Sequence, residues 1–298
     1  QNGIAYTAWW HDAYGSERSS LSLKTIQETG ANWVSITVTG YQDDINSIPA
    51  AWNDFIDTDK TPNDPNIMKA IDTANALGLK VMLKIHINTV DTTDGQWHGK
   101  IGENFEPTDW VNWFGAYQEF VKNYAVIAKN KGVDLFCIGT ELITTRSQKS
   151  HWINLIEGVK EVYGDSLTYA ANFEPDPNEI EWWSDLKYIG IDAYFPLDNK
   201  QNPTPNYDLA FLRSQWVNNV NNMKNLASRL DKEIIFTEIG YRSAEGARCE
   251  PWDCNEVWPI DLEEQRLLYQ AAFNEPYQQP WLAGIYWWNW EINPFDGG

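Results

Sequence analysis

Short apolar runs rich in β-branched and aromatic residues alternate with longer amphipathic segments along the whole chain. The short runs predict strands at residues 4–7, 33–38, 80–87, 135–141, 167–172, 188–194, 234–239 and 284–288. The longer segments predict helices at residues 21–29, 66–77, 110–130, 151–163, 209–230 and 262–274. This alternation is typical of repeated βα units and a parallel sheet.

Eight strands without a linker or low-complexity stretch predict an α/β protein in which residues 1–298 form a single catalytic (β/α)8 TIM barrel. Thr108 and Asp109 are candidate caps of the third helix. Between the fifth and sixth strands we expect only a short helical piece at 178–183, and no full helix after Trp290. The long polar connections 40–64 and 88–108 follow the second and third strands, at the face where such barrels carry out chemistry, and are candidate cleft walls.

The composition narrows the classes of function. A formal net charge of −20 repels nucleic acid and anionic lipid, so we expect neither as a partner. No apolar stretch reaches the roughly 18 residues needed to span a bilayer. The 17 Trp and 14 Tyr residues exceed what a core requires, and their flat faces can stack on sugar rings. We expect a secreted, extracellular monomer, and a first residue of Gln1 is what we expect if a signal peptide has been removed or the chain has been trimmed.

The cysteines and histidines do not predict a metal or a cofactor. Cys249 and Cys254 are close enough in the segment CEPWDC for a local disulfide in an oxidising compartment, whereas Cys137 lies in an apolar strand pattern. A zinc site at that segment would need two further ligands, and the four histidines show no ligand spacing.

Two glutamates end apolar strands and are the candidate catalytic residues. Glu141 closes LFCIGTE and Glu238 closes IIFTE. An acidic side chain there is costly unless it is paired or used, although a structural salt bridge would also satisfy it. The fourth and seventh strands lie across a barrel mouth, so the two carboxyl groups are expected within about 5 to 5.5 Å, the separation of a retaining glycosidase. One carboxyl then acts as acid/base and the other as nucleophile.

Further candidates follow from strand parity and loop position. Lys84, His86 and Asn88 alternate along the third strand and should point into the barrel mouth, where sugar hydroxyls, Glu141 or an internal ion pair would satisfy them. Tyr194 ends the sixth strand and is placed to orient the nucleophile. The candidate sugar-stacking or sugar-contacting residues at strand ends and in loops are Trp10, His11, Trp97, Tyr241 and Trp288. For each of them, the alternative is ordinary packing within the protein. Trp287 should face the opposite way and pack.

An ordered set of segments resembles glycoside hydrolase family 113 of clan A over nearly the whole chain. The segments are LKIHI (Lys84, His86), WHGKI (Trp97), GTEL (Glu141), IGIDAYFPL (Asp192, Tyr194), TEIGY (Glu238) and YWWNW (Trp288). The resemblance implies a retaining endo-β-1,4-mannanase without a metal, with Glu141 as acid/base and Glu238 as nucleophile. The broader clan usually has Asn before the acid/base to hold the sugar 2-hydroxyl. This chain has Thr140 there, so Asn172 is the substitute candidate.

The expected substrates are β-mannan, glucomannan and manno-oligosaccharides. Three alternatives stay open at the level of sequence. The same two carboxylates would serve a retaining endo-glycosidase of glucan or galactan, and a loop that blocks one end of the cleft would make an exo-β-mannosidase. A carbohydrate-binding barrel without catalysis is a more remote alternative, because such a module has no need for a paired acid and nucleophile.

Overall fold

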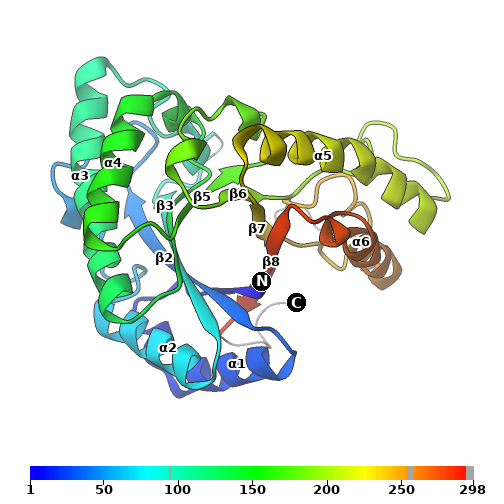
Figure 1. The fold of residues 1–298 in the computed structure, drawn as a ribbon, viewed down its shortest axis with the longest axis horizontal. Coiled ribbons are helices and arrows are strands. Elements are labelled where there is room, and N and C mark those ends of the chain that lie inside the picture. The colour runs from blue at the N-terminus through cyan, green and yellow to red at the C-terminus, as the bar shows by residue number, and fades with distance from the viewer. Residues whose placement is uncertain (94, 254–257, 293–298) are drawn as a thin grey trace.

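The computed structural model describes residues 1–93, 95–253 and 258–292, in which eight parallel strands close into a barrel (Figure 1). Each strand pairs with the next in sequence, and β8 returns to β1. The strands are β1 (Asn2–Thr7), β2 (Trp33–Gln42), β3 (Lys80–Thr89), β4 (Leu135–Thr140), β5 (Leu167–Asn172), β6 (Ile189–Asp192), β7 (Ile234–Ile239) and β8 (Leu282–Glu291). The predicted (β/α)8 fold class is confirmed.

Helices cover the outside of the barrel, with α1 to α4 along one side and α5 and α6 along the other (Figure 1). They are α1 (Glu17–Glu28), α2 (Asp64–Ala76), α3 (Pro107–Asn130), α4 (Lys149–Val162), α5 (Leu209–Leu230) and α6 (Leu262–Asn274). The predicted cap of α3 was misplaced. Asp109 lies inside the first turn, where its carboxylate accepts a hydrogen bond from the backbone N–H of Glu106 at 2.8 Å.

The wall between β5 and β6 lacks an α-helix, as predicted. Two short 3-10 turns, Pro177–Glu179 and Trp183–Asp185, replace it. Trp182 stacks on Trp152 of α4 with ring centroids 4.7 Å apart, and both indoles are fully buried. These large aromatic rings fill the volume that a helix would otherwise occupy.

The two long connections after β2 and β3 pack against each other. Both strands run further than predicted, to Gln42 and Thr89. Beyond them the backbone N–H of Gly102 donates to the carbonyl of Ile45 at 2.8 Å. The turns Trp52–Phe55 and His98–Lys100 give these connections local structure. They are therefore ordered walls beside the C-terminal ends of the strands.

The barrel interior changes character along its axis. The part towards the N-terminal ends of the strands is filled by a small apolar cluster of Met82, Leu135, Cys137, Ala170, Ile235 and Tyr286. Above it lie the buried Lys84 and Asp192, which are 1% and 0% exposed. Charged groups at this depth need partners. This polar layer forms the floor of the site at the C-terminal ends of the strands.

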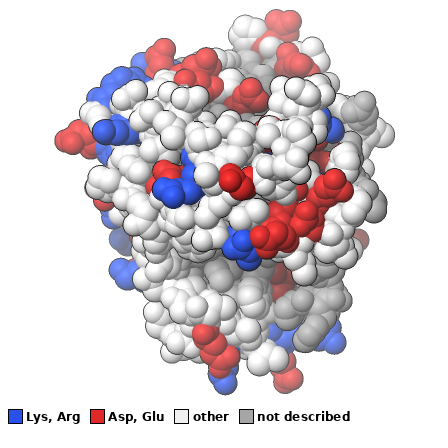
Figure 2. Space-filling view, turned by 90° about the vertical axis from the view of Figure 1, so that its right-hand side faces the viewer, with Lys and Arg blue, Asp and Glu red and all other residues white. Residues whose placement is uncertain are grey.

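The surface carries the excess of negative charge. On the face shown in Figure 2, acidic side chains form a group towards the right and are also spread over the top and bottom, with basic side chains between them. Among the helices described, none combines the length and the apolar character that a membrane span requires.

Candidate active site

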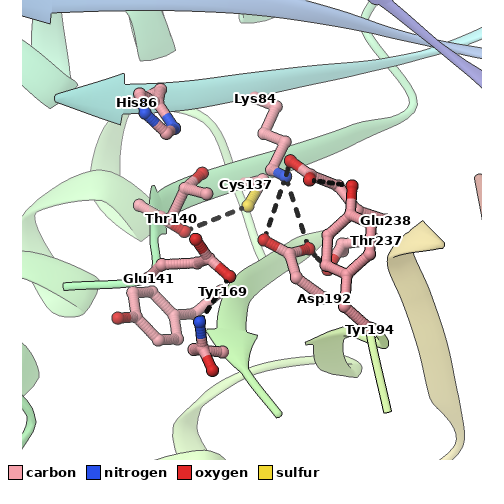
Figure 3. Close-up of polar contacts among 12 residues, drawn as sticks. Lys84, His86, Cys137, Thr140, Glu141, Tyr169, Asp192, Tyr194, Thr237 and Glu238 are labelled. Atoms are coloured by element: carbon pink, nitrogen blue, oxygen red, sulfur yellow. Dashed lines mark hydrogen bonds and ion pairs between the residues drawn. The ribbon is translucent and has the colours of Figure 1, made fainter. Parts of the chain in front are cut away.

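Lys84 from the middle of β3 forms a buried ionic cluster with Asp192 and Glu238 at the C-terminal ends of β6 and β7 (Figure 3). The Lys84 ammonium contacts Glu238 Oε1 and lies 3.4 Å from both carboxylate oxygens of Asp192. The Thr237 hydroxyl donates to Asp192 Oδ1 at 2.6 Å. One ammonium thus holds two carboxylates in a region from which water is largely excluded.

A shift of register lets two consecutive residues of β7 serve this cluster. Strict alternation would put Thr237 and Glu238 on opposite faces of the sheet. The pairing of β6 with β7 slips between Ile191 and Asp192, so that Asp192 lies opposite Glu238. A bulge of this kind re-aims side chains. As a result Thr237 reaches Asp192 while Glu238 reaches Lys84.

Tyr194 fixes the second oxygen of Glu238. Its hydroxyl, which is buried just beyond the end of β6, donates to Glu238 Oε2 at 2.8 Å. Glu238 therefore has one oxygen on an ammonium and the other on a phenol. Both contacts fix the orientation of this carboxyl group, as a nucleophile requires.

Glu141 has a different environment, although it lies at the same mouth. It follows β4 in the left-handed backbone region with φ of 52°, which is uncommon for a residue other than glycine. Its backbone N–H donates to the carbonyl of Ala170 at 2.8 Å, and its Oε1 accepts from Asn172 Nδ2 at 2.8 Å. A strained backbone that is held by defined hydrogen bonds aims this side chain into the site.

Burial, followed by the charge of Glu238, raises the pKa of Glu141 to about 8, against the opposing effects of Lys84 and Asn172. Burial and Glu238 also raise the pKa of Asp192, which Lys84 and Thr237 oppose. Burial lowers the pKa of Lys84, but Asp192 and Glu238 together raise it above its ordinary value. At neutral pH Glu141 therefore keeps its proton while Lys84 stays charged.

Two histidines and one asparagine lie next to Glu141. His98 Nε2 is 3.4 Å from Glu141 Oε2, and the rings of His86 and His98 are 4.5 Å apart. Asn88 Oδ1 is 3.3 Å from His86 Nε2 and 3.2 Å from His98 Nδ1. Burial, and then Lys84, lowers the pKa of His98 to about 3, so the contact between His98 and Glu141 joins two neutral groups.

Three residues predicted to contact substrate are buried and have other contacts in the described structure. The Lys84 ammonium forms ion pairs with Asp192 and Glu238, and the side chain does not reach the surface. The Thr140 hydroxyl is 1% exposed and donates to the carbonyl of Ile85 at 2.8 Å. Tyr241 is 5% exposed and packs edge-on against Tyr269 of α6. All three side chains are buried, so their contact with a sugar stays a prediction.

The other predicted residues lie at the mouth or in its loops. Trp10 and Trp97 are 64% and 40% exposed in the connections after β1 and β3, and His11 is exposed beside Trp10. Trp288 is half-buried near the end of β8, and its ring lies 6.0 Å from the Lys84 ammonium. Trp287 packs on Tyr269 and Phe273 of α6, as its parity predicted.

Strand parity and motif position did not predict His98 or Thr237 as site residues, and they assigned no role to Asp192. His98 follows Trp97 within the segment WHGKI, so a signal was present, but strand parity cannot place a loop residue. The predicted disulfide involves Cys254, which lies outside the described residues. Across the chain as described, no group of three or more His, Cys, Asp or Glu side chains is arranged to hold a metal ion.

Two carboxyl groups at the ends of β4 and β7, in unlike surroundings, are the arrangement of a barrel glycoside hydrolase. The model of glycoside hydrolase family 113 matches residues 6–296, and the chain belongs to that family. A search among curated proteins gave no match.

Solved structures agree with the family. A complex of a GH113 β-1,4-mannanase is 25% identical with a TM-score of 0.84, over 97% of this chain and 88% of that one. The GH113 β-mannanase AaManA from Alicyclobacillus acidocaldarius, in complex with ManMIm, is 27% identical with a TM-score of 0.84, over 97% and 87%. A family 5 mannosidase from Rhizomucor miehei, 14% identical with a TM-score of 0.63 over 96% and 80%, shares the fold.

Proposed function

We propose that this glycoside hydrolase is a retaining endo-β-1,4-mannanase that acts on β-mannan, glucomannan and manno-oligosaccharides, and that it works as a secreted monomer. The observation that carries the mechanism is the unequal treatment of the two carboxyl groups. Glu238 is held by an ammonium and a phenol, whereas burial keeps the proton on Glu141. The similarity to two GH113 mannanases supports the substrate class.

In the first step, Glu141 gives its proton to the glycosidic oxygen while a Glu238 oxygen attacks the anomeric carbon. The bond to the leaving sugar breaks, and a covalent glycosyl-enzyme forms. Lys84 remains beneath Glu238 and stabilises the carboxylate that leaves in the second step. Glu141, now ionised, takes a proton from water, whose oxygen attacks the anomeric carbon and releases a product of the original configuration.

The exposed tryptophans support a polymeric substrate. Trp10, Trp52, Trp97, Trp252 and Trp258 are between 39% and 64% exposed. All five lie in connections that follow the C-terminal ends of strands β1, β2, β3 and β7. An aromatic face that stays in water serves to stack on a sugar ring rather than to fill a core. Their spread over several connections favours contacts with several sugar units.

The test is a substrate panel with product sizes resolved. Wild-type protein should release short manno-oligosaccharides from β-mannan and glucomannan, and little from cellulose or galactan. A control variant is Glu157→Gln, which changes an exposed glutamate on α4. It should keep the full activity of the wild-type protein. Release of mannose alone would contradict endo-action, and activity confined to glucan or galactan would contradict the mannan assignment. Binding without hydrolysis would overturn the enzyme reading.

A further inference from the structure

The His98 ring lies between Asn88 on one side and Glu141 on the other. It is 8% exposed, and its two nitrogens face different residues: Nδ1 faces Asn88 Oδ1 at 3.2 Å and Nε2 faces Glu141 Oε2 at 3.4 Å. In the described structure Nε2 has no hydrogen-bond partner, and its approach to Glu141 Oε2 is a contact at 3.4 Å. A buried nitrogen aimed at a carboxyl group calls for a chemical explanation.

Counting protons assigns the tautomer of His98. A neutral imidazole carries one N–H, and an amide oxygen can only accept. Because Asn88 Oδ1 faces Nδ1, the proton of His98 lies on Nδ1. The same oxygen has a second lone pair, which accepts from His86 Nε2 at 3.3 Å. Nε2 of His98 is then left as a lone pair directed at Glu141.

The two oxygens of Glu141 are also distinguished. Asn172 Nδ2 donates to Oε1 at 2.8 Å, so Oε1 is the acceptor oxygen. The acidic proton then lies on Oε2, the oxygen that faces His98. A distance of 3.4 Å is longer than an ordinary hydrogen bond, and contacts of this kind tighten when substrate closes a site.

We propose that His98, with its tautomer set by Asn88, is a positioning residue: its Nε2 accepts a hydrogen bond from the protonated Oε2 of Glu141 and so holds the acid/base side chain in one orientation until the proton passes to the glycosidic oxygen. This role rests on the proposed function of Glu141. It needs no change in the charge of His98 and no additional reactant.

The charges around the pair explain why a neutral imidazole suits this position. The charged and titratable groups that interact with Glu141 are Glu238 of β7, Lys84 of β3, Asp192 of β6, Tyr169 of β5 and Tyr194, while His86 of β3 acts on His98. A cation at His98 would stabilise the ionised form of Glu141 and discharge the acid too early. Burial and Lys84 keep His98 neutral, so it orients the proton without promoting its loss.

The tautomer is tested directly by NMR of the ¹⁵N-histidine-labelled protein. The chain holds four histidines, so the signals are assigned with variants in which one histidine at a time is replaced by Phe. We expect His98 to be neutral at pH 7 with its proton on Nδ1, and Asn88→Leu to move that proton to Nε2 in part. A proton on Nε2 in the wild-type protein, or a protonated ring at pH 7, would overturn the proposal.

The consequence for the acid is tested with His98→Phe, which keeps an apolar ring in the site but removes the lone pair. The pKa of Glu141, followed by ¹³C NMR of labelled glutamate without substrate, should fall by roughly half a unit to one unit. On β-mannan, kcat should fall about five- to tenfold with KM little changed, since His98 acts through Glu141. The control is His151→Phe. His151 lies on α4, where its ring stacks on Phe114 of α3, so this variant should change neither the pKa of Glu141 nor kcat.

A double-variant cycle separates this role from packing. If Asn88 acts by fixing His98, the pKa shifts of Asn88→Leu and His98→Phe will not add in the double variant. Additive shifts, or a Glu141 pKa that His98→Phe leaves unchanged, contradict the proposal. If wild-type protein leaves mannan intact, the substrate assignment fails on its own, because the NMR titrations still report on His98 and Glu141.

Discussion

Glu141 combines several costs that a purely structural residue would avoid. It is a buried acid, it faces a second carboxylate, and its backbone is left-handed. Each of these disfavours the folded state, by about 1 kcal/mol or more for the backbone alone. Destabilising features of this kind are typical of active sites. Here the same burial that destabilises the folded state raises the pKa of Glu141 and makes it an acid at neutral pH.

The raised pKa of Glu141 predicts the basic limb of the pH profile. The acid must be protonated in the first step, so kcat/KM should fall as the pH rises through about 8. The measurement is the pH dependence of kcat/KM on a soluble manno-oligosaccharide. A profile that loses activity already near pH 5 would show that the acid has an ordinary carboxyl pKa and would contradict the assignment of Glu141.

The same shift predicts a stability effect with a definite sign. The pKa of Glu141 is raised from its ordinary value of 4.5 to about 8 in the folded protein, so the unfolded state loses this proton first. The free energy of unfolding should therefore decrease as the pH rises between these two values. Glu141→Gln should stabilise the protein at pH 8 by roughly 1 to 3 kcal/mol, and little at pH 4.

Urea unfolding of Glu141→Gln and wild type at both pH values measures this difference, with Glu157→Gln as the exposed control. Glu141→Gln should also lower kcat on mannan by about a hundredfold or more. Equal stability of the two proteins at pH 8 would mean that the carboxyl group is not held protonated.

At the scale of elements, a buried arginine joins the connections that follow β6 and β7. Arg248 Nε pairs with Asp198 Oδ2 at 2.9 Å, and Nη1 pairs with Glu264 Oε2 of α6 at 2.9 Å. Its guanidinium lies 4.0 Å from the centroid of the Tyr207 ring, and the Tyr207 hydroxyl donates to Glu264. This network ties together the connections beside Tyr194 and Glu238.

Glu264→Gln should destabilise the protein by about 3 kcal/mol, because it leaves a buried guanidinium without one of its two carboxylates. The neighbouring Glu263→Gln is the control, since Glu263 pairs with Arg266 on the surface of the same helix and should matter little. Thermal unfolding of both variants measures the difference. A loss of stability that is no larger for Glu264→Gln than for Glu263→Gln would rule out a structural role for this network.

Periodicity predicted the elements well, because eight buried strands and the helices that cover them leave clear hydrophobic patterns. It also placed Glu141, Glu238 and Tyr194 at strand ends. It could not foresee the slipped register of β7, which lets Thr237 and Glu238 serve one cluster. Nor could it tell that Tyr241 is covered by α6, or that the loop residue His98 meets Glu141, since tertiary packing decides both.

For the whole molecule, the net charge of −20 sets the response to salt. Like charges repel most in the compact state, and added salt screens that repulsion. The melting temperature should therefore rise when sodium chloride is increased from about 10 mM to about 0.15 M, where the Debye length falls from about 30 to about 8 Å. A melting temperature that falls with salt would show that attractive surface pairs dominate instead.

The central claim is that Glu238 is the nucleophile and Glu141 the acid/base of a double displacement. The most direct measurement is the anomeric configuration of the products that Glu238→Ala and Glu141→Ala form from an aryl β-mannobioside in the presence of azide. Glu238→Ala should give the α-glycosyl azide, because azide attacks the substrate itself from the opposite face. Glu141→Ala should give the β-glycosyl azide, because azide attacks the glycosyl-enzyme. The same anomer from both variants, or wild-type hydrolysis with inversion, would contradict the account.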